Sequence, residues 1–309
     1  MNTKQNILKN LIYFALGLAL LWSCNADRED FQGEKYESIN SGTLTVHCEE
    51  SLYKLLDSAF KLYQTAYPKI QLKVEIVHSR KAMALLLSGE SEAVITARSF
   101  LTDEDSLMKA YDVKRHEMIA ASDALVFYVN KNFPLDTLNH EQLVNVLSNK
   151  ENLKDLFPQL LNEPEFVCNS TNSSEFANVQ KLVLKDKLLN KYFRTFNTCD
   201  SVQKYILSNS SAIGIGYLSQ IYGNPELKAL EIGFINDKGN RVFPQTVHQG
   251  FIVQGKYPYI NKIRVFLKDD RMNKPFWFAS FMSKEAVVQK YLKDMGIVPE
   301  YARFKLTKE

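Results

Sequence analysis

Three short polar segments hold the side chains that could bind a small charged solute. Residues 48–51 (Cys-Glu-Glu-Ser), 97–99 (Ala-Arg-Ser) and 169–174 (Asn-Ser-Thr-Asn-Ser-Ser) each follow an apolar stretch that is typical of a strand. In open α/β sheets, ligands bind outside the carboxyl ends of the strands, often where helices begin. Amide, hydroxyl and guanidinium groups at such places favour an oxyanion as the ligand.

The last of these segments favours an anion more clearly than the other two. Backbone N–H groups at Ser173, Ser174 and Glu175 would point outward with the dipole of the following helix behind them. Ser170 and Asn172 add side-chain donors to the same loop. Ser and Asn are also preferred turn and N-cap residues whatever the function. The composition therefore leaves both an anion cradle and plain helix capping open.

Arg98 is the best cationic partner for an oxyanion, because a guanidinium group binds such anions through two parallel hydrogen bonds. A surface position or a structural ion pair is the alternative. Glu49 and Glu50 oppose a fully charged phosphate; they could accept the proton of a monoprotonated oxyanion, pair with Arg98 or face solvent. Because an unpaired carboxylate beside an anion is costly, we expect at least one of them to pair with Arg98.

The sequence does not favour an enzyme or a metal protein. His47 and Cys48 are adjacent, and neighbouring strand residues point to opposite faces of a sheet. No second cluster has zinc-type spacing, and nucleophile-elbow, P-loop, dinucleotide and zincin motifs are absent. An anion-acting hydrolase would need a poised nucleophile, and none is recognisable. We therefore expect a binding protein without catalytic residues, metal or cofactor.

The elements expected around the polar segments form an α/β layer. Alternating and helical apolar patterns follow one another from residue 43 onward. The predicted strands and helices are 43–47, 52–63, 70–76, 81–87 and 93–96, followed by a helix opened by a capping box at residues 102–105. This β-α-β-α-β-α order implies a mostly parallel sheet.

The rest of the chain continues the α/β pattern. Extended runs are predicted at 118–130, 165–168, 212–217, 229–235 and 242–254. Helices are predicted at 140–147, after residue 174, after a cap at Asp200, and over 276–295 with an end at Gly296. The runs at 118–130 and 242–254 are long enough to lead from one domain into another.

The N-terminus has the pattern of an export signal. Lys4 and Lys9 precede an apolar run of twelve residues at 11–22, which is too short for a comfortable membrane span. Leu-Trp-Ser-Cys at 21–24 resembles the lipobox of bacterial lipoproteins, in which Cys24 is lipidated and becomes the mature N-terminus. We expect a signal peptide over 1–23 and a flexible tether over 24–42. A plain cleaved signal or a short anchor helix is the alternative.

Composition and charge fit a globular protein of about two domains. The chain has 309 residues, of which 45% are hydrophobic and 24% charged, with a formal net charge of +3. The absence of a basic block or stripe argues against nucleic-acid binding. Three cysteines remain after Cys24, and the sequence leaves open whether Cys168 and Cys199 form a disulfide or stay buried thiols.

Several motifs in order along the chain resemble one family. Residues 48–52 are similar to its "DESF" loop, 93–102 to "IVTRPLT" with one extra residue, and 169–174 to "DNPNSST". Further matches are 122–130 to "DAxxxxVN", 138–150 to "LTxxQLxxIxxGK", 211–217 to "AIGY", 257–258 to "YPLSR" and 295–299 to "GFVP". Over residues 43–303 the chain resembles the phosphate-binding proteins of phosphate-specific ABC importers, especially the shorter lipoprotein forms of Bacteroidetes.

The resemblance implies a periplasmic-binding-protein-like α/β fold of type 2. Two lobes, each a mixed sheet flanked by helices, would enclose a ligand cleft, with crossovers near 124–131 and 242–254. Lobe 1 would comprise 43–126 and 246–309, and lobe 2 would comprise 127–245. Carried over from the family, the ligand-binding residues would be Glu50, Ser51, Arg98, Ser99, Ser170, Asn172, Ser173 and Ser174.

The implied role is capture of phosphate or a similar tetrahedral oxyanion for an ABC permease in the inner membrane. The protein would be a monomer, lipid-anchored in the cell envelope and facing the periplasm, with the outer-membrane surface left open. Asn169 stands where the family has an acid, Thr171 where it has Pro, and Glu175 where it has Thr. These departures support the alternative of a ligand-less module that acts as a sensor or protein-interaction subunit of an envelope complex.

Overall fold

The computed structural model describes residues 39–114, 116–185 and 187–301. From Asn40 onward these residues belong to one compact unit. The expected signal peptide, Cys24 and most of the expected tether lie outside these residues. No helix in the described part of the chain is long and apolar enough to cross a membrane.

The first part of the chain confirms the predicted β-α-β-α-β-α order. Its elements are β1 (Gly42–Glu49), α2 (Glu50–Ala66), β2 (Ile70–Val77), α3 (Ser79–Leu87), β3 (Ala93–Thr96) and α4 (Thr102–Ala110). α2 ends just before Pro68, as expected, and Glu104 closes a capping box at the start of α4 through the N–H of Leu101 (2.9 Å).

The second part of the chain adds the remaining strands and helices. The strands are β4 (His116–Asn130), β5 (Thr137–Asn139), β6 (Glu165–Cys168), β7 (Phe193–Thr195), β8 (Ala212–Tyr217), β9 (Leu227–Ala229), β10 (Glu231–Ile235), β11 (Arg241–Val242), β12 (Ile260–Leu267) and β13 (Val298–Pro299). The helices are α5 (His140–Leu147), α6 (Leu153–Leu156), α7 (Ser174–Asn178) with the π-helical turn Val179–Leu184, α8 (Cys199–Ser208), α9 (Leu218–Ile221), α10 (Gln249–Val253), α11 (Lys274–Lys284) and α12 (Ala286–Asp294).

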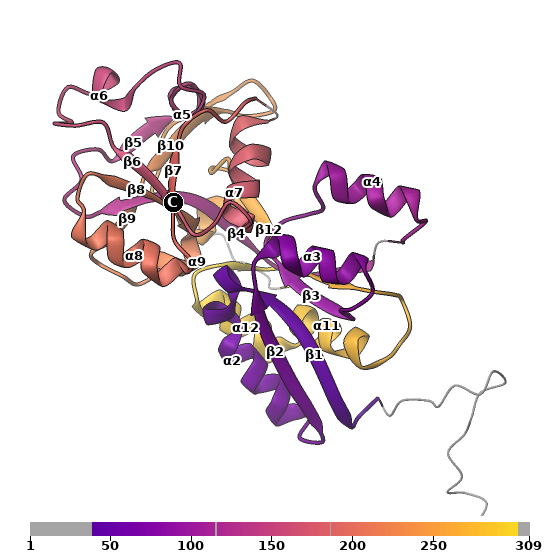
Figure 1. Ribbon diagram of the computed structural model, residues 1–309. Helices are drawn as coiled ribbons and strands as arrows, with labels where there is room; N and C mark the ends of the chain where they lie inside the picture. Colours follow the sequence, from indigo (N-terminus) through magenta and orange to yellow (C-terminus); the bar gives the residue numbers. More distant parts are fainter. Residues whose placement is uncertain (1–38, 115, 186, 302–309) are drawn as a thin grey trace, which may run out of the picture. The chain divides into compact units, whose positions relative to one another are not determined.

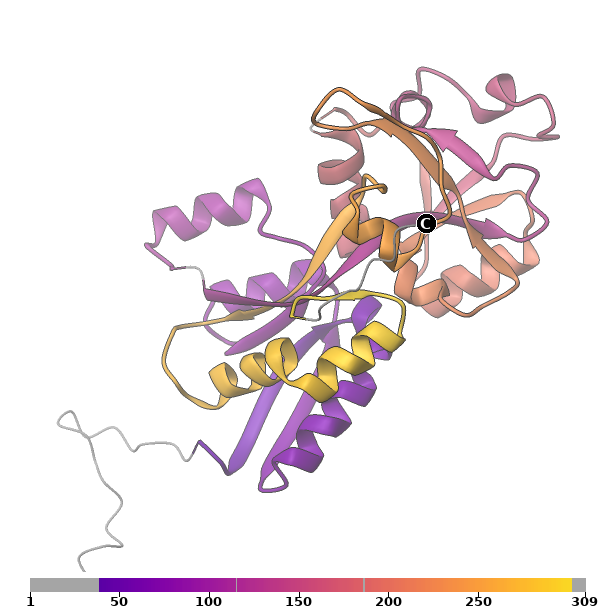
Figure 2. The same ribbon diagram turned by 180° about the vertical axis from the view of Figure 1, so that it is seen from behind.

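One long strand, β4, joins two halves of a mixed sheet. The strand order is β2-β1-β3-β12-β4-β8-β6-β7. The first half of β4 pairs with β12 and β13, and its second half pairs antiparallel with β8 and β9. Within the two halves, β1 runs parallel to β2 and β3, and β6 runs parallel to β7 and β8. Figures 1 and 2 show β4 passing between the two groups of elements.

Helices cover both faces of the first half of the sheet. α2, α11 and α12 contact one another on one side, where Tyr63 packs edge-on against Phe278 and Phe281 (Figure 2). α3 packs against β1 and β3, and its Met83 shares a separate apolar cluster with Val94 of β3. Val94 alternates with Ile95, which belongs to the main core, so α3 covers the opposite face.

Four of the predicted elements differ from the structure. The extended run at 242–254 is wrong: β11 ends at Val242, and His248 caps α10 by accepting a hydrogen bond from the N–H of Gly250 (3.1 Å). The predicted helix 276–295 breaks at Glu285, whose backbone is extended. α8 is capped by Thr198 rather than by Asp200.

The fourth difference is a strand that divides between two sheets. The predicted strand 229–235 is interrupted at Leu230, whose N–H donates to the carbonyl of Phe127 (2.7 Å). β9 pairs with β4, whereas β10 pairs with β5 in a separate three-stranded sheet. The expected lobe boundaries at 126/127 and 245/246 stay a prediction.

Candidate functional site

The three polar segments converge at the carboxyl ends of β1, β3 and β6. Glu49, the last residue of β1, is 1% exposed and extends its carboxylate between the other two segments. One carboxylate oxygen accepts a hydrogen bond from the N–H of Ser174 (2.8 Å). The other accepts from the Thr96 hydroxyl (2.8 Å) and from the N–H of Ala97 (3.1 Å). Three donors from two distant segments therefore surround one oxyanion, the carboxylate of the chain itself.

Glu50 repeats this arrangement one residue further along. Its carboxylate accepts from the N–H of Cys199 at the start of α8 (3.2 Å to each oxygen) and from the side-chain amide of Asn169 (2.6 Å). The first N–H groups of a helix have no partner within the helix, so these contacts satisfy donors that would otherwise need water or a ligand. Two consecutive glutamates, at the end of β1 and the start of α2, thus contact segments that follow strands of the second half of the sheet.

A buried polar group fixes the start of α7 against its neighbours. The Ser174 hydroxyl lies 2.6 Å from the hydroxyl of Tyr217 in β8. The side-chain amide of Asn178 donates to the carbonyl of Ala97 (2.9 Å) and to the Tyr217 hydroxyl (3.0 Å). Burial raises the pKa of Tyr217 well above its usual value, so its hydroxyl keeps its proton. The N–H groups of Ala97 and Ser174 are therefore held in place by side chains that do not themselves contact Glu49.

Glu175 places a third carboxyl group beside this site. It is fully buried, and one of its oxygens accepts from the side-chain amide of Gln220 (3.1 Å) and from the Cys199 thiol (3.4 Å). Its other oxygen has no hydrogen-bond partner among the described residues. Burial, and then the negative charge of Glu49, raise the pKa of Glu175 to about 7. Near neutral pH the Glu175 carboxyl is therefore protonated in a large fraction of the molecules and does not add a full negative charge.

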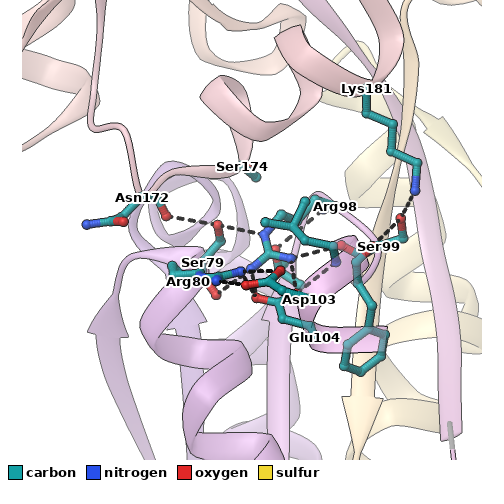
Figure 3. A network of polar contacts seen from close by, with 12 residues as sticks. Ser79, Arg80, Arg98, Ser99, Asp103, Glu104, Asn172, Ser174 and Lys181 are labelled. Atoms are coloured by element: carbon teal, nitrogen blue, oxygen red, sulfur yellow. Dashed lines mark hydrogen bonds and ion pairs between the residues drawn. The ribbon is translucent and has the colours of Figure 1, made fainter. Parts of the chain in front are cut away.

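Arg98 is committed to partners within the protein. It is 2% exposed, and its guanidinium donates to both carboxylate oxygens of Glu104 (2.7 and 2.8 Å). Its other N–H groups donate to the hydroxyl and the carbonyl of Ser79 (3.0 and 3.3 Å) and to the carbonyl of Ser99 (2.9 Å). Figure 3 shows these contacts around the guanidinium group.

The predicted pairing of Arg98 with Glu49 or Glu50 is therefore wrong. All five N–H groups of Arg98 are engaged, so in this arrangement none is left for an anion. The pairing with Glu104 holds the loop after β3 against the start of α3, because Arg80 of α3 pairs with Glu104 (2.9 Å) and with Asp103. Arg98 thus positions the N–H of Ala97 rather than contacting the site directly.

The remaining predicted residues lie around the site in capping and loop contacts. Ser173 caps α7 by accepting from the N–H of Phe176 (3.3 Å), and its own N–H donates to the carbonyl of Ser170 (3.1 Å) instead of pointing freely outward. The Asn172 carbonyl accepts from the N–H of Arg80 and from the Ser79 hydroxyl (both 3.1 Å). Lys181 donates to the Ser99 hydroxyl.

A hollow of about 950 Å³ opens beside Glu50 and Ser51. It is lined by α2, α8 and α9, with Tyr53, Gln203, Ser219, Gln220 and Tyr222 among its residues. The Ser51 and Ser219 hydroxyls are buried and have no partner among the described residues. These two hydroxyl groups and the Glu50 side chain therefore lie at the wall of this hollow.

The three described cysteines form no disulfide. Cys48, Cys168 and Cys199 are free thiols, which settles the question of a disulfide between the last two. Burial raises the pKa of Cys199, so its thiol stays protonated, and its single hydrogen is shared between Glu50 (3.2 Å) and Glu175 (3.4 Å). No group of three His, Cys, Asp or Glu in the described part of the chain could hold a metal ion.

Sequence reasoning missed several residues that build the site. Thr96, Asn178, Tyr217 and Gln220 come from β3, the end of α7, β8 and α9. Thr96 had a signal, because it ends a predicted strand directly before Ala97. The others are brought in by the packing of elements far apart in the sequence.

Comparison with known proteins places the chain in a family. Residues 35–285 match the model of the PBP superfamily domain, and the chain belongs to that superfamily. A search of curated proteins finds no match. The expectation of a binding protein rather than an enzyme agrees with this family.

Solved structures with the same fold include phosphate receptors. A Clostridium perfringens protein assigned as a phosphate ABC transporter substrate-binding protein, solved with bound phosphate, is 14% identical (TM-score 0.68; 84% of this chain and 99% of that chain). An ABC-type phosphate transport receptor from Vibrio cholerae is 18% identical (TM-score 0.62; 84% and 100%). PstS from Borrelia burgdorferi is 15% identical (TM-score 0.53; 84% and 99%). At these identities the likeness confirms the periplasmic-binding-protein-like fold.

Proposed function

We propose that this chain is an extracytoplasmic solute-binding protein whose ligand is a small tetrahedral oxyanion, with phosphate as the first candidate. The observation that carries the proposal is the set of donors around Glu49. The Thr96 hydroxyl and the N–H groups of Ala97 and Ser174 all point at one oxyanion, with N···O and O···O distances between 2.8 and 3.1 Å. Such preorganised donors recognise an oxyanion without a cation in direct contact.

The residues expected from the sequence take different parts in this proposal. Ser174 supplies a donor, and Glu50 and Ser51 border the hollow through which the solute enters. Arg98, Ser99, Ser170, Asn172 and Ser173 hold the loops in place through the contacts described above. Because Glu49, Glu50 and Glu175 lie together, a monoprotonated anion is favoured over a fully charged one.

The cellular setting belongs to the same proposal. The N-terminal pattern supports a lipid anchor at Cys24 and an address in the cell envelope. The similarity to a phosphate ABC transporter substrate-binding protein and to an ABC-type phosphate transport receptor supports a permease of the inner membrane as the partner.

A hydroxyl deletion tests the binding role. Thr96→Val keeps the shape of the side chain and removes one donor. Because the same hydroxyl binds the Glu49 carboxylate when no phosphate is bound, phosphate affinity should fall by less than the roughly tenfold expected for loss of one hydrogen bond to a charged group. Isothermal titration of the purified chain with phosphate, sulfate, arsenate and molybdate measures this. Thr65→Val, on the exposed surface of α2, is the matched control. Equal affinities of Thr96→Val and the control would refute the assignment of this donor.

One observation favours a second function. The donors of the site are already satisfied by Glu49, which suits a ligand-less module that acts through protein contacts. In that case none of the four anions would raise the unfolding temperature. A ligand at one hundred times its dissociation constant would add about 2.7 kcal/mol to the stability of the folded state, so its absence is readily measured.

A further inference from the structure

We propose that Glu49 is an internal ligand of the cleft, and that an external oxyanion binds by displacing its carboxylate. The inference rests on one part of the proposed function, namely that the donors around Glu49 form an oxyanion site. It adds that this residue competes with the solute and thereby sets how strongly, and which, oxyanions bind.

The geometry supports competition rather than cooperation. A carboxylate and a phosphate are both oxyanions, and each can accept two or more hydrogen bonds from N–H or O–H groups on one side of the anion. The donors at Thr96, Ala97 and Ser174 are each taken by one of the two Glu49 oxygens. Glu49 is 1% exposed, so no space beside its carboxylate is open to a second oxyanion.

Electrostatic repulsion prevents the Glu49 carboxylate and an external oxyanion from occupying this donor site together. Glu175 is fully buried next to Glu49, and its second oxygen lacks a partner in the described residues. Arg98 is neutralised by Glu104 and offers no free N–H group. A dianion added to these groups would meet uncompensated negative charge, whereas a dianion that takes the place of the Glu49 carboxylate adds only one unit of negative charge there.

The contacts of Glu49 and Glu50 also join the two halves of the sheet. Glu49 leaves β1 and contacts Ser174 after β6, and Glu50 contacts Asn169 and Cys199. In binding proteins of two lobes, the ligand supplies the contacts that hold the lobes closed. Here two carboxylates of the chain supply contacts between the two halves of the sheet, as a bound oxyanion would.

Removal of the internal ligand should create a site for small oxyanions. In Glu49→Ala, the vacated donors should bind formate, acetate and inorganic phosphate, with phosphate affinity at least tenfold higher than in the wild type. Glu49→Gln keeps the shape of the side chain but turns one acceptor oxygen into an N–H₂ group. This side chain holds the donors less well, so the phosphate affinity of Glu49→Gln should also exceed that of the wild type. Isothermal titration of the full chain in detergent, together with unfolding temperatures in each salt, measures both effects. Glu226→Gln, at an exposed glutamate, is the matched control.

The outcomes separate this inference from the proposed function. If the wild type and both Glu49 variants bind phosphate equally, the internal ligand is refuted and the oxyanion site survives. Phosphate binding by the wild type that is lost in both variants also refutes it, because Glu49 would then contact the solute. If neither the wild type nor either variant responds to any probe, both the inference and the oxyanion site fail. Glu49→Gln keeps the test valid if Glu49→Ala does not fold.

Discussion

Glu175 gives the protein a pH-dependent stability that a single substitution should remove. The group is fully buried, and its pKa rises from 4.5 in the unfolded chain to about 7 in the folded protein, through burial and the charge of Glu49. The folded state therefore holds a proton that the unfolded chain has released over this range. The stabilising contribution is fully present below about pH 4.5 and is lost as the pH rises through about 7.

The magnitude follows from the gap between the two pKa values. One pKa unit corresponds to about 1.4 kcal/mol, so the contribution changes by about 3 kcal/mol between pH 4.5 and pH 8. Glu175→Gln replaces the carboxyl by a neutral amide, so the difference in unfolding free energy between wild type and variant should fall by this amount as the pH rises.

Urea denaturation of both proteins at half-unit steps from pH 5 to pH 8 measures the effect. The same series on Glu226→Gln, an exposed glutamate paired with Lys131, should run parallel to the wild type. Parallel curves for the wild type and Glu175→Gln would show that Glu175 is ionised in the folded protein across this range, which would refute the electrostatic account of the site.

Three further results follow from other buried contacts. Arg98→Met and Glu104→Gln should each lower the unfolding free energy by about 3–5 kcal/mol, because each leaves a buried charge or hydrogen-bonding partner unpaired. Lys131→Met, in an exposed ion pair, should cost at most about 1 kcal/mol. Equal costs in urea denaturation would contradict the burial argument. Asp123→Asn should remove a second pH-dependent contribution of the same sign between about pH 4 and pH 6, because burial raises the pKa of Asp123 to about 6, and an unchanged pH profile would count against it. Gly296→Ala should lower the unfolding temperature more than Gly239→Ala, because both glycines have φ near +80° but only a Cβ at Gly296 would overlap the Tyr222 ring. Equal falls in unfolding temperature would contradict a role for this overlap and leave the backbone conformation as the cause of the destabilisation.

Local apolar patterns predict the elements that position the site. β3, β6, β8 and α5 begin and end at the predicted residues, because each is a short apolar or amphipathic run bounded by polar residues. The run at 242–254 misleads, since its apolar residues alternate over a segment in which His248 starts a helix. Alternation alone does not show whether a partner strand lies beside the run.

The chemistry of the site was predictable only in part. The pairing of Arg98 with Glu104 had a signal, because Glu104 also closes the capping box at the start of α4 and so lies near the loop. The contact of Glu49 with Ser174 had no such signal, because the two residues are 125 positions apart in the sequence and only the folded chain brings the end of β1 to the start of α7. Sequence therefore identified the three loops that meet in the structure, but did not show that a carboxylate of the chain lies between them.

The most direct test of the oxyanion site is a crystal structure of the protein grown with phosphate, after removal of any solute carried through purification. We predict a phosphate oxygen within hydrogen-bond distance of the Thr96 hydroxyl and of the N–H groups of Ala97 and Ser174, with the Glu49 carboxylate turned away. Phosphate bound at another place, or an unmoved Glu49 at saturating phosphate, would contradict the account.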